Sequence, residues 1–142
     1  MRQASQHQDR ANNSGSSRNN DDTLYGEAGN DVLVGSYGDD TLDGGTGADT
    51  IYSGGGSDTI VLRVGDGGST LAAADTITDF TDGSDVLGMD DGMQYTDLTI
   101  AQGTGSNSSD TIISAGSEYL MILTGIDVSA LSEADFTPVD IV

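Results

Sequence analysis

A nine-residue period between residues 26 and 61 constrains the fold of this chain more than any other feature. In each nine, the fourth position is glycine, the sixth is aspartate and the eighth is leucine or isoleucine. A weaker copy at residues 17–25 keeps the last two of these positions. The recurring residues are Gly29, Gly38, Gly47 and Gly56; Asp22, Asp31, Asp40, Asp49 and Asp58; Leu24, Leu33, Leu42, Ile51 and Ile60. Such a period predicts a solenoid in which each repeat contacts its neighbours.

Each repeat divides into a turn of six residues, rich in Gly, Asn and Asp, and a strand of three. Alternate strand residues face opposite sides, so the eighth position predicts an interior ladder of single aliphatic side chains. The seventh and ninth positions are then expected to face solvent: Thr23, Tyr25, Thr41, Asp43, Thr50 and Tyr52. Two repeats complete one coil, which puts Asp22, Asp40 and Asp58 on one edge and Asp31 and Asp49 on the other.

This geometry brings carboxylates into stacks. At about 5 Å, two of them repel by roughly 3 kcal/mol at an effective dielectric constant of 20. One buried aliphatic side chain contributes about 1.5–3 kcal/mol, whereas ordering nine backbone residues costs on the order of 9–18 kcal/mol. The repeats are therefore not expected to fold near neutral pH without a bound cation.

Calcium fits this requirement best, because it takes six to eight hard oxygen ligands in flexible geometry. The aspartate column would supply carboxylates, and the glycines would let main-chain carbonyls turn towards the ion. Magnesium demands stricter octahedral geometry, and the repeats contain no His or Cys for zinc. The sequence therefore predicts several Ca²⁺ ions between the turns.

Composition limits the partners. The chain has 24 acidic and 4 basic residues and a formal net charge of −20, which excludes nucleic acid and anionic membrane surfaces as partners. No apolar run is long enough to insert into a membrane. High negative charge with few aromatic residues is also typical of disorder, which stays the alternative for the ligand-free chain.

The residues needed for catalysis are largely missing. The sequence has no Lys and no Cys, and its one histidine, His7, lies in a polar N-terminal stretch. A Ser-His-Asp or Cys-His relay and a phosphate-binding loop are therefore excluded. A pair of carboxylates could in principle hydrolyse glycosides, but most acids lie at turn positions. We expect no enzyme activity, although the chain could be the non-catalytic C-terminal part of a secreted enzyme.

The pattern resembles the haemolysin-type, or repeat-in-toxin (RTX), nonapeptide Gly-Gly-x-Gly-x-Asp-x-(Leu/Ile)-x. The copy starting at Gly44 fits every fixed position, whereas Arg18, Glu27, Ser36 and Ser53 depart from it. The resemblance implies an all-β fold, a right-handed parallel β-roll that is a β-helix-like solenoid. Similar modules occur at the C-terminus of serralysin-type proteases and as R-modules of alginate epimerases.

The same resemblance implies calcium sites between turns two repeats apart. The implied pairs are 26–31 with 44–49, 35–40 with 53–58, a weaker pair of 17–22 with 35–40, and 44–49 with the degenerate segment 62–67. Besides the aspartates, the implied ligands are the main-chain carbonyls of Gly26, Ala28, Gly29, Gly35, Tyr37, Gly38, Gly44, Gly45, Gly47, Gly54 and Gly56.

Residues 75–87 look like the segment that commonly follows such rolls in secreted bacterial proteins. Asp75 and Asp79 are expected to project from one face of a strand, where they either bind a further calcium ion or are solvated. Ile77 and Phe80 are expected in the core where the roll is capped.

Beyond residue 94 the period is lost. Strands are predicted at 98–102, 111–114 and 119–124, arranged as a meander or a pair of hairpins that caps the roll with partly antiparallel strands. Residues 128–136 predict a helical turn that Pro138 ends. The chain is thus divided into a disordered tail or linker (1–16), a calcium-binding β-roll (17–67) and a C-terminal extension (68–142).

Function follows from the resemblance. Asp140 and the two apolar residues after it resemble the uncleaved C-terminal signal of bacterial proteins exported by type I secretion machinery. The implied role is calcium-triggered folding outside the cell, which stabilises a larger secreted protein and assists its export. The alternative is a polysaccharide-binding accessory module or adhesin segment, with Tyr25, Tyr37 and Tyr52 as contacts. A monomer is expected, with pairing of exposed strand edges between copies as the alternative.

Overall fold

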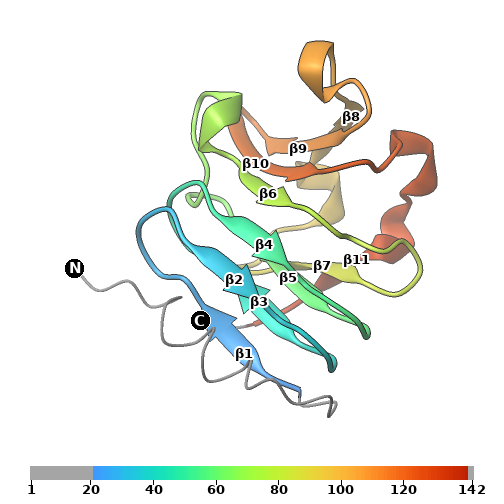
Figure 1. Cartoon of the computed structure of the whole chain (residues 1–142). Helices are drawn as coiled ribbons and strands as arrows, with labels where there is room; N and C mark the ends of the chain where they lie inside the picture. Colours follow the sequence, from blue (N-terminus) through green and yellow to red (C-terminus); the bar gives the residue numbers. More distant parts are fainter. Residues whose placement is uncertain (1–20, 141–142) are drawn as a thin grey trace.

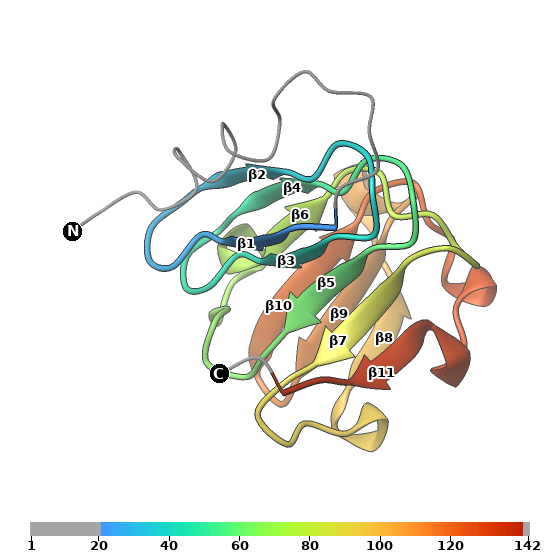
Figure 2. The same ribbon diagram turned by 90° about the horizontal axis from the view of Figure 1, so that it is seen from below.

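Two β-sheets face each other in the computed structural model, which describes residues 21–140 (Figures 1 and 2). The first sheet has the order β1-β3-β5-β7-β11 and the second the order β2-β4-β6-β10-β9-β8. Within the described range the only helical segments are short 3₁₀ turns. The strands are β1 Thr23–Tyr25, β2 Val32–Val34, β3 Thr41–Asp43, β4 Thr50–Tyr52, β5 Thr59–Leu62, β6 Asp75–Ile77, β7 Val86–Met89, β8 Thr99–Gln102, β9 Thr111–Ala115, β10 Glu118–Leu123 and β11 Phe136–Pro138.

Successive repeats alternate between the two sheets. The strands of the repeats pair in parallel, with Leu24 opposite Leu42 and Leu42 opposite Ile60 in the first sheet. In the second sheet Leu33 lies opposite Ile51. Each strand therefore pairs with the strand two repeats away, which confirms that two repeats make one coil of a parallel β-roll.

The eighth position of each repeat forms the predicted interior ladder. Leu24 is 2% exposed and the four equivalent residues after it are fully buried. Val32, at a seventh position, is 47% exposed, and Tyr52, at a ninth, is 44% exposed. The prediction is wrong for Asp43, which is buried because it contacts Arg63.

Both sheets continue beyond the repeats. β6 pairs in parallel with β4, and β7 pairs in parallel with β5, so that Ile77 lies opposite Ile51 and Leu87 opposite Ile60. Ile77 and Phe80 are buried, as predicted. The core of the roll is therefore continuous with that of the residues that follow it.

The C-terminal strands close this core. β10 pairs in parallel with β6 and antiparallel with β9, which pairs antiparallel with β8, so the predicted meander is confirmed. The helical-turn prediction for 128–136 is corrected: two 3₁₀ turns, Val128–Ala130 and Glu133–Asp135, lead into β11. Pro138 ends this strand instead of a helix, and an edge strand tolerates proline because it needs no donor there.

Two predicted features lie outside the described residues. The tail at 1–16 is one, and the last two residues of the proposed secretion signal are the other. No helical segment among residues 21–140 has the length and apolar character that a membrane span requires.

Two glycines offer a matched test of how closely the coils stack. Gly45 has φ +79° and Gly92 has φ +78°, so alanine is strained at both. A Cβ on Gly45 would overlap the carbonyl oxygen of Glu27 in the preceding coil, whereas no atom lies within 4 Å of a Cβ on Gly92. We expect Gly92→Ala to lower the free energy of unfolding by about 1–2 kcal/mol.

Gly45→Ala should lower the same free energy by about 1–3 kcal/mol more, since the overlap forces the backbones of two coils apart. Denaturant unfolding of both variants in excess calcium measures the difference. Equal losses in the two variants would show that the stacking distance does not require glycine at residue 45.

Candidate metal centre

The turns of the repeats stack along two edges of the roll. The first edge carries the turns 26–31 and 44–49, joined by the hydrogen bonds Gly26 N–Asp43 O (2.8 Å) and Thr46 N–Glu27 O (2.8 Å). The second edge carries the turns 35–40 and 53–58, joined in the same way by Gly35 N–Tyr52 O and Gly55 N–Ser36 O, both 2.8 Å. The structure thus brings together turns that are two repeats apart.

The second position of each turn adopts a left-handed backbone conformation. It has φ +79° at Gly45 and +90° at Gly54, and the departures from the repeat pattern, Glu27 (+71°) and Ser36 (+74°), adopt it as well. These two side chains therefore leave the shape of the turn unchanged. They do so at a cost in strain of about 1–3 kcal/mol each.

The aspartates of the sixth position form a ladder across the turns. The amide of Asp31 donates to Oδ1 of Asp49 (2.8 Å), and the amide of Asp40 donates to Oδ1 of Asp58 (2.9 Å). The weaker first copy follows the same rule, since the amide of Asp22 donates to Oδ1 of Asp40 (2.8 Å). One oxygen of each accepting carboxylate is thus fixed by a backbone amide of the coil before it.

The ladder continues past the repeats on both edges. The amide of Asp49 donates to Asp75 (2.9 Å) and the amide of Asp58 donates to Asp85 (3.0 Å). The sequence pattern predicted Asp75 as a ligand but missed Asp85. Asp75 lies 26 residues after its donor, outside the nine-residue period. Asp85 lies 27 residues, or three periods, after its donor, and Gly83 and Leu87 fall on the fourth and eighth positions, so the period did carry a signal for Asp85.

The second carboxylate oxygen of several ladder residues has no hydrogen-bond donor among residues 21–140. This Oδ2 is buried in Asp22, Asp40, Asp49 and Asp58. A Cβ added to Gly44 would overlap Oδ2 of Asp49, so glycine keeps the space beside this oxygen open. Because a buried carboxylate oxygen without a partner is costly, these atoms fit a cation that binds through oxygen.

Burial changes the titration of these carboxyl groups. It raises the pKa of Asp58 to about 7, an effect that the Asp40 amide opposes and the charges of Asp85 and Asp40 reinforce. Burial likewise raises the pKa of Asp40 to about 6. Burial also raises the pKa of Asp49, and the charge of Asp31 reinforces this effect. Burial raises the pKa of Asp75 as well, reinforced by the charge of Asp49. The polypeptide alone therefore does not compensate these charges.

A calcium ion would draw most of its ligands from the main chain. Among residues 21–140, no group of three or more His, Cys, Asp or Glu side chains converges on one point. The stacked turns instead offer one carboxylate per turn and a series of carbonyl groups. Such a set of hard oxygen donors is the kind that calcium accepts.

Asp79 departs from the prediction that it shares a strand face with Asp75. β6 ends at Ile77, so Asp79 lies beyond the strand. Its oxygens accept hydrogen bonds from the amides of Ser53 (2.8 Å) and Gly54 (3.0 Å), on the second edge, whereas Asp75 binds an amide on the first. The two carboxylates therefore lie at opposite ends of β6, because this strand crosses from one edge to the other.

A second ladder, which the sequence pattern did not predict, uses the fifth position of the repeats. Oδ1 of Asp21 accepts the amide of Asp39 (2.9 Å), and Oδ1 of Asn30 accepts the amide of Ala48 (2.9 Å). Asp39 in turn accepts the amide of Ser57 (2.8 Å). In the sixth-position ladder the earlier turn donates its amide to the later one, whereas in the fifth-position ladder the later turn donates to the earlier one. Each pair of turns is therefore held by hydrogen bonds in both directions.

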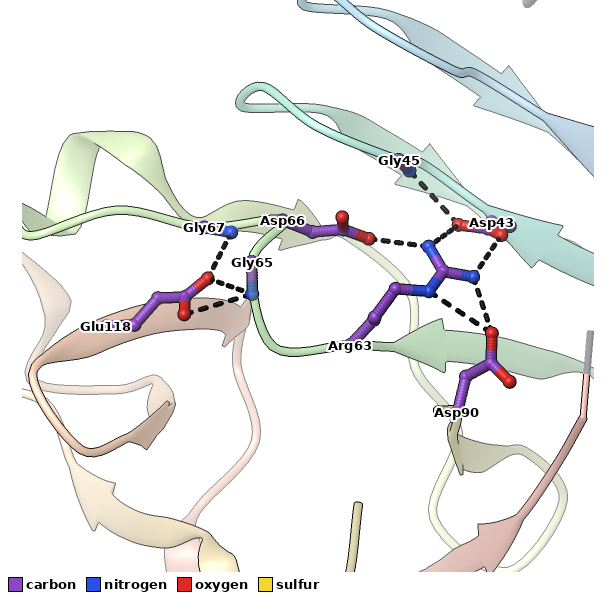
Figure 3. Close-up of polar contacts among 8 residues, drawn as sticks. All are labelled: Asp43, Gly45, Arg63, Gly65, Asp66, Gly67, Asp90 and Glu118. Atoms are coloured by element: carbon purple, nitrogen blue, oxygen red, sulfur yellow. Dashed lines mark hydrogen bonds and ion pairs between the residues drawn. The ribbon is translucent and has the colours of Figure 1, made fainter. Parts of the chain in front are cut away.

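The degenerate segment 62–67 holds an arginine instead of a repeated turn. Arg63 forms ion pairs with Asp43, Asp66 and Asp90 (Figure 3). The resemblance implied that segment 62–67 would stack on turn 44–49. In the structure the amide of Asp49 donates to Asp75 instead, so Asp75 takes the next place in the ladder. Sequence reasoning missed this ion-pair network, although Arg63 is the only basic residue after residue 18.

Comparison with known proteins agrees with this geometry. The family model of the RTX calcium-binding nonapeptide repeat matches residues 16–36, 25–60 and 34–68. The chain is similar to the solution structure of the AlgE6R3 subunit of the mannuronan C5-epimerase of Azotobacter vinelandii, with 25% identity over 82% of this chain and 77% of that chain and a TM-score of 0.59.

The AlgE6R2 subunit of the same enzyme is similar in fold, with 24% identity over 87% of this chain and 91% of that chain and a TM-score of 0.54. No curated protein sequence matches the chain. The repeats, the parallel β-roll and the acidic turns together show that the repeat segment of this chain belongs to the RTX calcium-binding nonapeptide repeat family.

Proposed function

We propose that this chain is a calcium-binding module whose roll folds when calcium neutralises its stacked turns. One observation supports this above all others: the buried Oδ2 atoms of Asp40, Asp49 and Asp58 accept no hydrogen bond within the described range. In a metal-free chain these oxygens would be desolvated without compensation. A divalent cation supplies the missing positive charge and accepts oxygen ligands from both members of a pair of turns.

The proposed ligands follow the two edges. On the first edge, Asp31, Asp49 and Asp75 with the carbonyls of turns 26–31 and 44–49 would hold the ions. On the second edge, Asp22, Asp40 and Asp58 would act with turns 35–40 and 53–58. Asp79 is left out of this set, because both of its oxygens already accept backbone amides.

We further propose that the module works outside a bacterial cell as part of a larger exported protein. In this proposal residues 17–67 form the calcium-dependent roll and 68–142 cap it. Low calcium inside the cell would leave the roll extended for the type I export machinery, and millimolar calcium outside would fold it. The steep repulsion among unneutralised carboxylates supports such a switch.

A second candidate function is binding of an acidic polysaccharide in the presence of calcium. Its support is the similarity to a subunit of a mannuronan epimerase and the exposure of two tyrosines in the roll, Tyr37 (56%) and Tyr52 (44%). Tyr25 is more covered than either. Titration calorimetry with soluble alginate in excess calcium separates this function from calcium-dependent folding alone.

Removal of calcium is the direct test of the proposed function. We expect a calcium chelator to abolish the circular dichroism signal of the roll, because the carboxylates then repel one another. Millimolar calcium should restore the signal, whereas the same concentration of magnesium should not, since magnesium requires stricter octahedral geometry. A spectrum that responds neither to chelator nor to calcium would contradict the proposal.

The two edges should lose calcium separately. Asp49→Asn removes a charge from the first edge, and we expect it to weaken calcium binding there by about tenfold or more while turns 35–40 and 53–58 respond normally. Resolved amide NMR signals followed during a calcium titration distinguish the edges. Asp39→Asn is the matched control, since it removes a charge but keeps the Oδ1 that accepts the Ser57 amide. Equal weakening of both edges by Asp49→Asn would contradict two independent sets of sites.

Acidification should have opposite effects on the metal-free fold and on calcium binding. The pKa values of Asp40 (about 6) and Asp58 (about 7) in the folded chain lie above the ordinary value of 3.8. Between pH 3.8 and these raised values, the folded chain therefore binds more protons than the unfolded chain. Stability of the chelated protein should therefore fall as pH rises from 5 to 7.5. Calcium affinity should rise over the same range, because the ion competes with those protons. Circular dichroism with chelator and with graded calcium at both pH values measures the two trends, and trends of the same sign would refute this explanation.

A further inference from the structure

Arg63 is the only basic residue between residues 21 and 140. Its Nη2 lies 2.8 Å from Oδ2 of Asp43 and 2.7 Å from Oδ2 of Asp90, and its Nη1 lies 2.8 Å from Oδ2 of Asp66 (Figure 3). Nε adds a second hydrogen bond to Asp90 at 3.2 Å. A single guanidinium thus serves three carboxylates that come from widely separated parts of the sequence.

This cluster is largely shielded from solvent. The side chain of Asp90 is 0% exposed, that of Asp43 6% and that of Arg63 14%. Burial alone would lower the pKa of Arg63, but its hydrogen bonds with Asp43 and Asp90 raise it above the ordinary value. The guanidinium therefore keeps its positive charge at every pH at which the protein would be studied.

The cluster lies at the C-terminal ends of three neighbouring strands of the first sheet. Asp43 ends β3, Arg63 follows β5 and Asp90 follows β7, so all three lie on the first edge of the roll. Oδ1 of Asp43 also accepts the amide of Gly45 (3.1 Å), which ties the cluster to the start of turn 44–49. The guanidinium therefore lies where the regular series of stacked acidic turns ends.

The turn that carries Arg63 is also fixed to the second sheet. Glu118, the first residue of β10, accepts the amides of Gly65 (2.8 Å) and Gly67 (2.7 Å) through Oε2 (Figure 3). Arg63 and Glu118 thus hold this turn from two sides. The ion pairs reach β3, β5 and β7 of the first sheet, and the glutamate reaches the C-terminal strands of the second.

The C-terminal half also buries more apolar surface than the repeats do. Each repeat contributes one aliphatic residue to the interior, whereas the later strands contribute larger and more numerous side chains. In β7 to β11, those with at most 7% exposure are Leu87, Met89, Ile113, Leu120, Met121, Leu123 and Phe136. Burial of this kind does not depend on a metal.

We propose that Arg63 is an internal cation that takes the place of calcium at the end of the roll. Its single charge pairs with Asp43, Asp66 and Asp90 and offsets part of their repulsion, so that the coil containing β5 and β7 and the C-terminal strands fold in the absence of calcium. The inference rests on the proposed function, because it assumes that the preceding turns need calcium for the same purpose. It adds that the chain contains a calcium-dependent half and a calcium-independent half, with the boundary at Arg63.

Hydrogen exchange detected by mass spectrometry in excess chelator tests this assignment. In the unaltered chain we expect protected amides in β7, β10 and β11 and rapid exchange in β1 to β4. Arg63→Gln should reduce the protection of β7, β10 and β11 by about 100-fold or more, because removing one partner leaves the others buried without a counter-charge. Ser106→Asp, at an exposed residue, makes the same change in net charge and should leave the protection unchanged.

A compensated variant separates charge from simple misfolding. Arg63→Met combined with Asp43→Asn and Asp90→Asn removes the cation together with two of its partners, and it should recover most of the protection that Arg63→Gln loses. Undiminished protection in Arg63→Gln, or absence of any protected strand in the chelated parent chain, would overturn the assignment. Failure of the proposed function would appear differently, as β1 to β4 whose exchange does not slow when calcium is added to the parent chain.

Discussion

Stacking acidic turns at the spacing of a parallel sheet is the constraint on which this structure depends. The strand pairing fixes an aspartate of each turn next to its equivalent two repeats later, as the bond from the Asp40 amide to Asp58 shows. The backbone satisfies one oxygen of each carboxylate in this way and leaves the second one buried. The interior ladder offers too little apolar burial to outweigh the repulsion, and for this reason we propose that the fold of the repeats is coupled to neutralisation of their edges.

The chain meets this constraint in two chemically different ways. Along the repeats, the same glycine positions that allow close stacking also keep carbonyl and carboxylate oxygens accessible to an ion. Past the repeats, insertions lengthen the coils, and several carboxylates are satisfied from within the chain. Asp79 and Asp85 accept amides, and Asp90, together with Asp43 of the repeats, accepts the guanidinium of Arg63. The change from one solution to the other coincides with the loss of the nine-residue period.

The sequence predicted the parts of the molecule that obey this period. Leu33 and Ile51 face each other in the interior, and the turns of Asp31 and Asp49 stack, because a fixed repeat length leaves one register for a coil. The partners of Arg63 could not be found in this way, since their spacing depends on insertions whose path the sequence does not reveal. Asp85 keeps the phase of the period, but it was missed because the two sixth positions before it, Gly67 and Thr76, lack the aspartate. The fifth-position ladder was missed for another reason: Asn30 and Asp39 stand at a position that the repeat pattern leaves free.

The fifth position of the turns carries more negative charge on the second edge than on the first. The second edge has Asp21 and Asp39 there, beside Asp22, Asp40 and Asp58, whereas the first edge has the neutral Asn30 and Ala48. Asn30 and Asp39 each accept an amide of the next coil through Oδ1. The hydrogen bond between the turns is therefore the same, and only the charge of the side chain differs. We therefore propose that Asp21 and Asp39 add to the calcium requirement of the second edge.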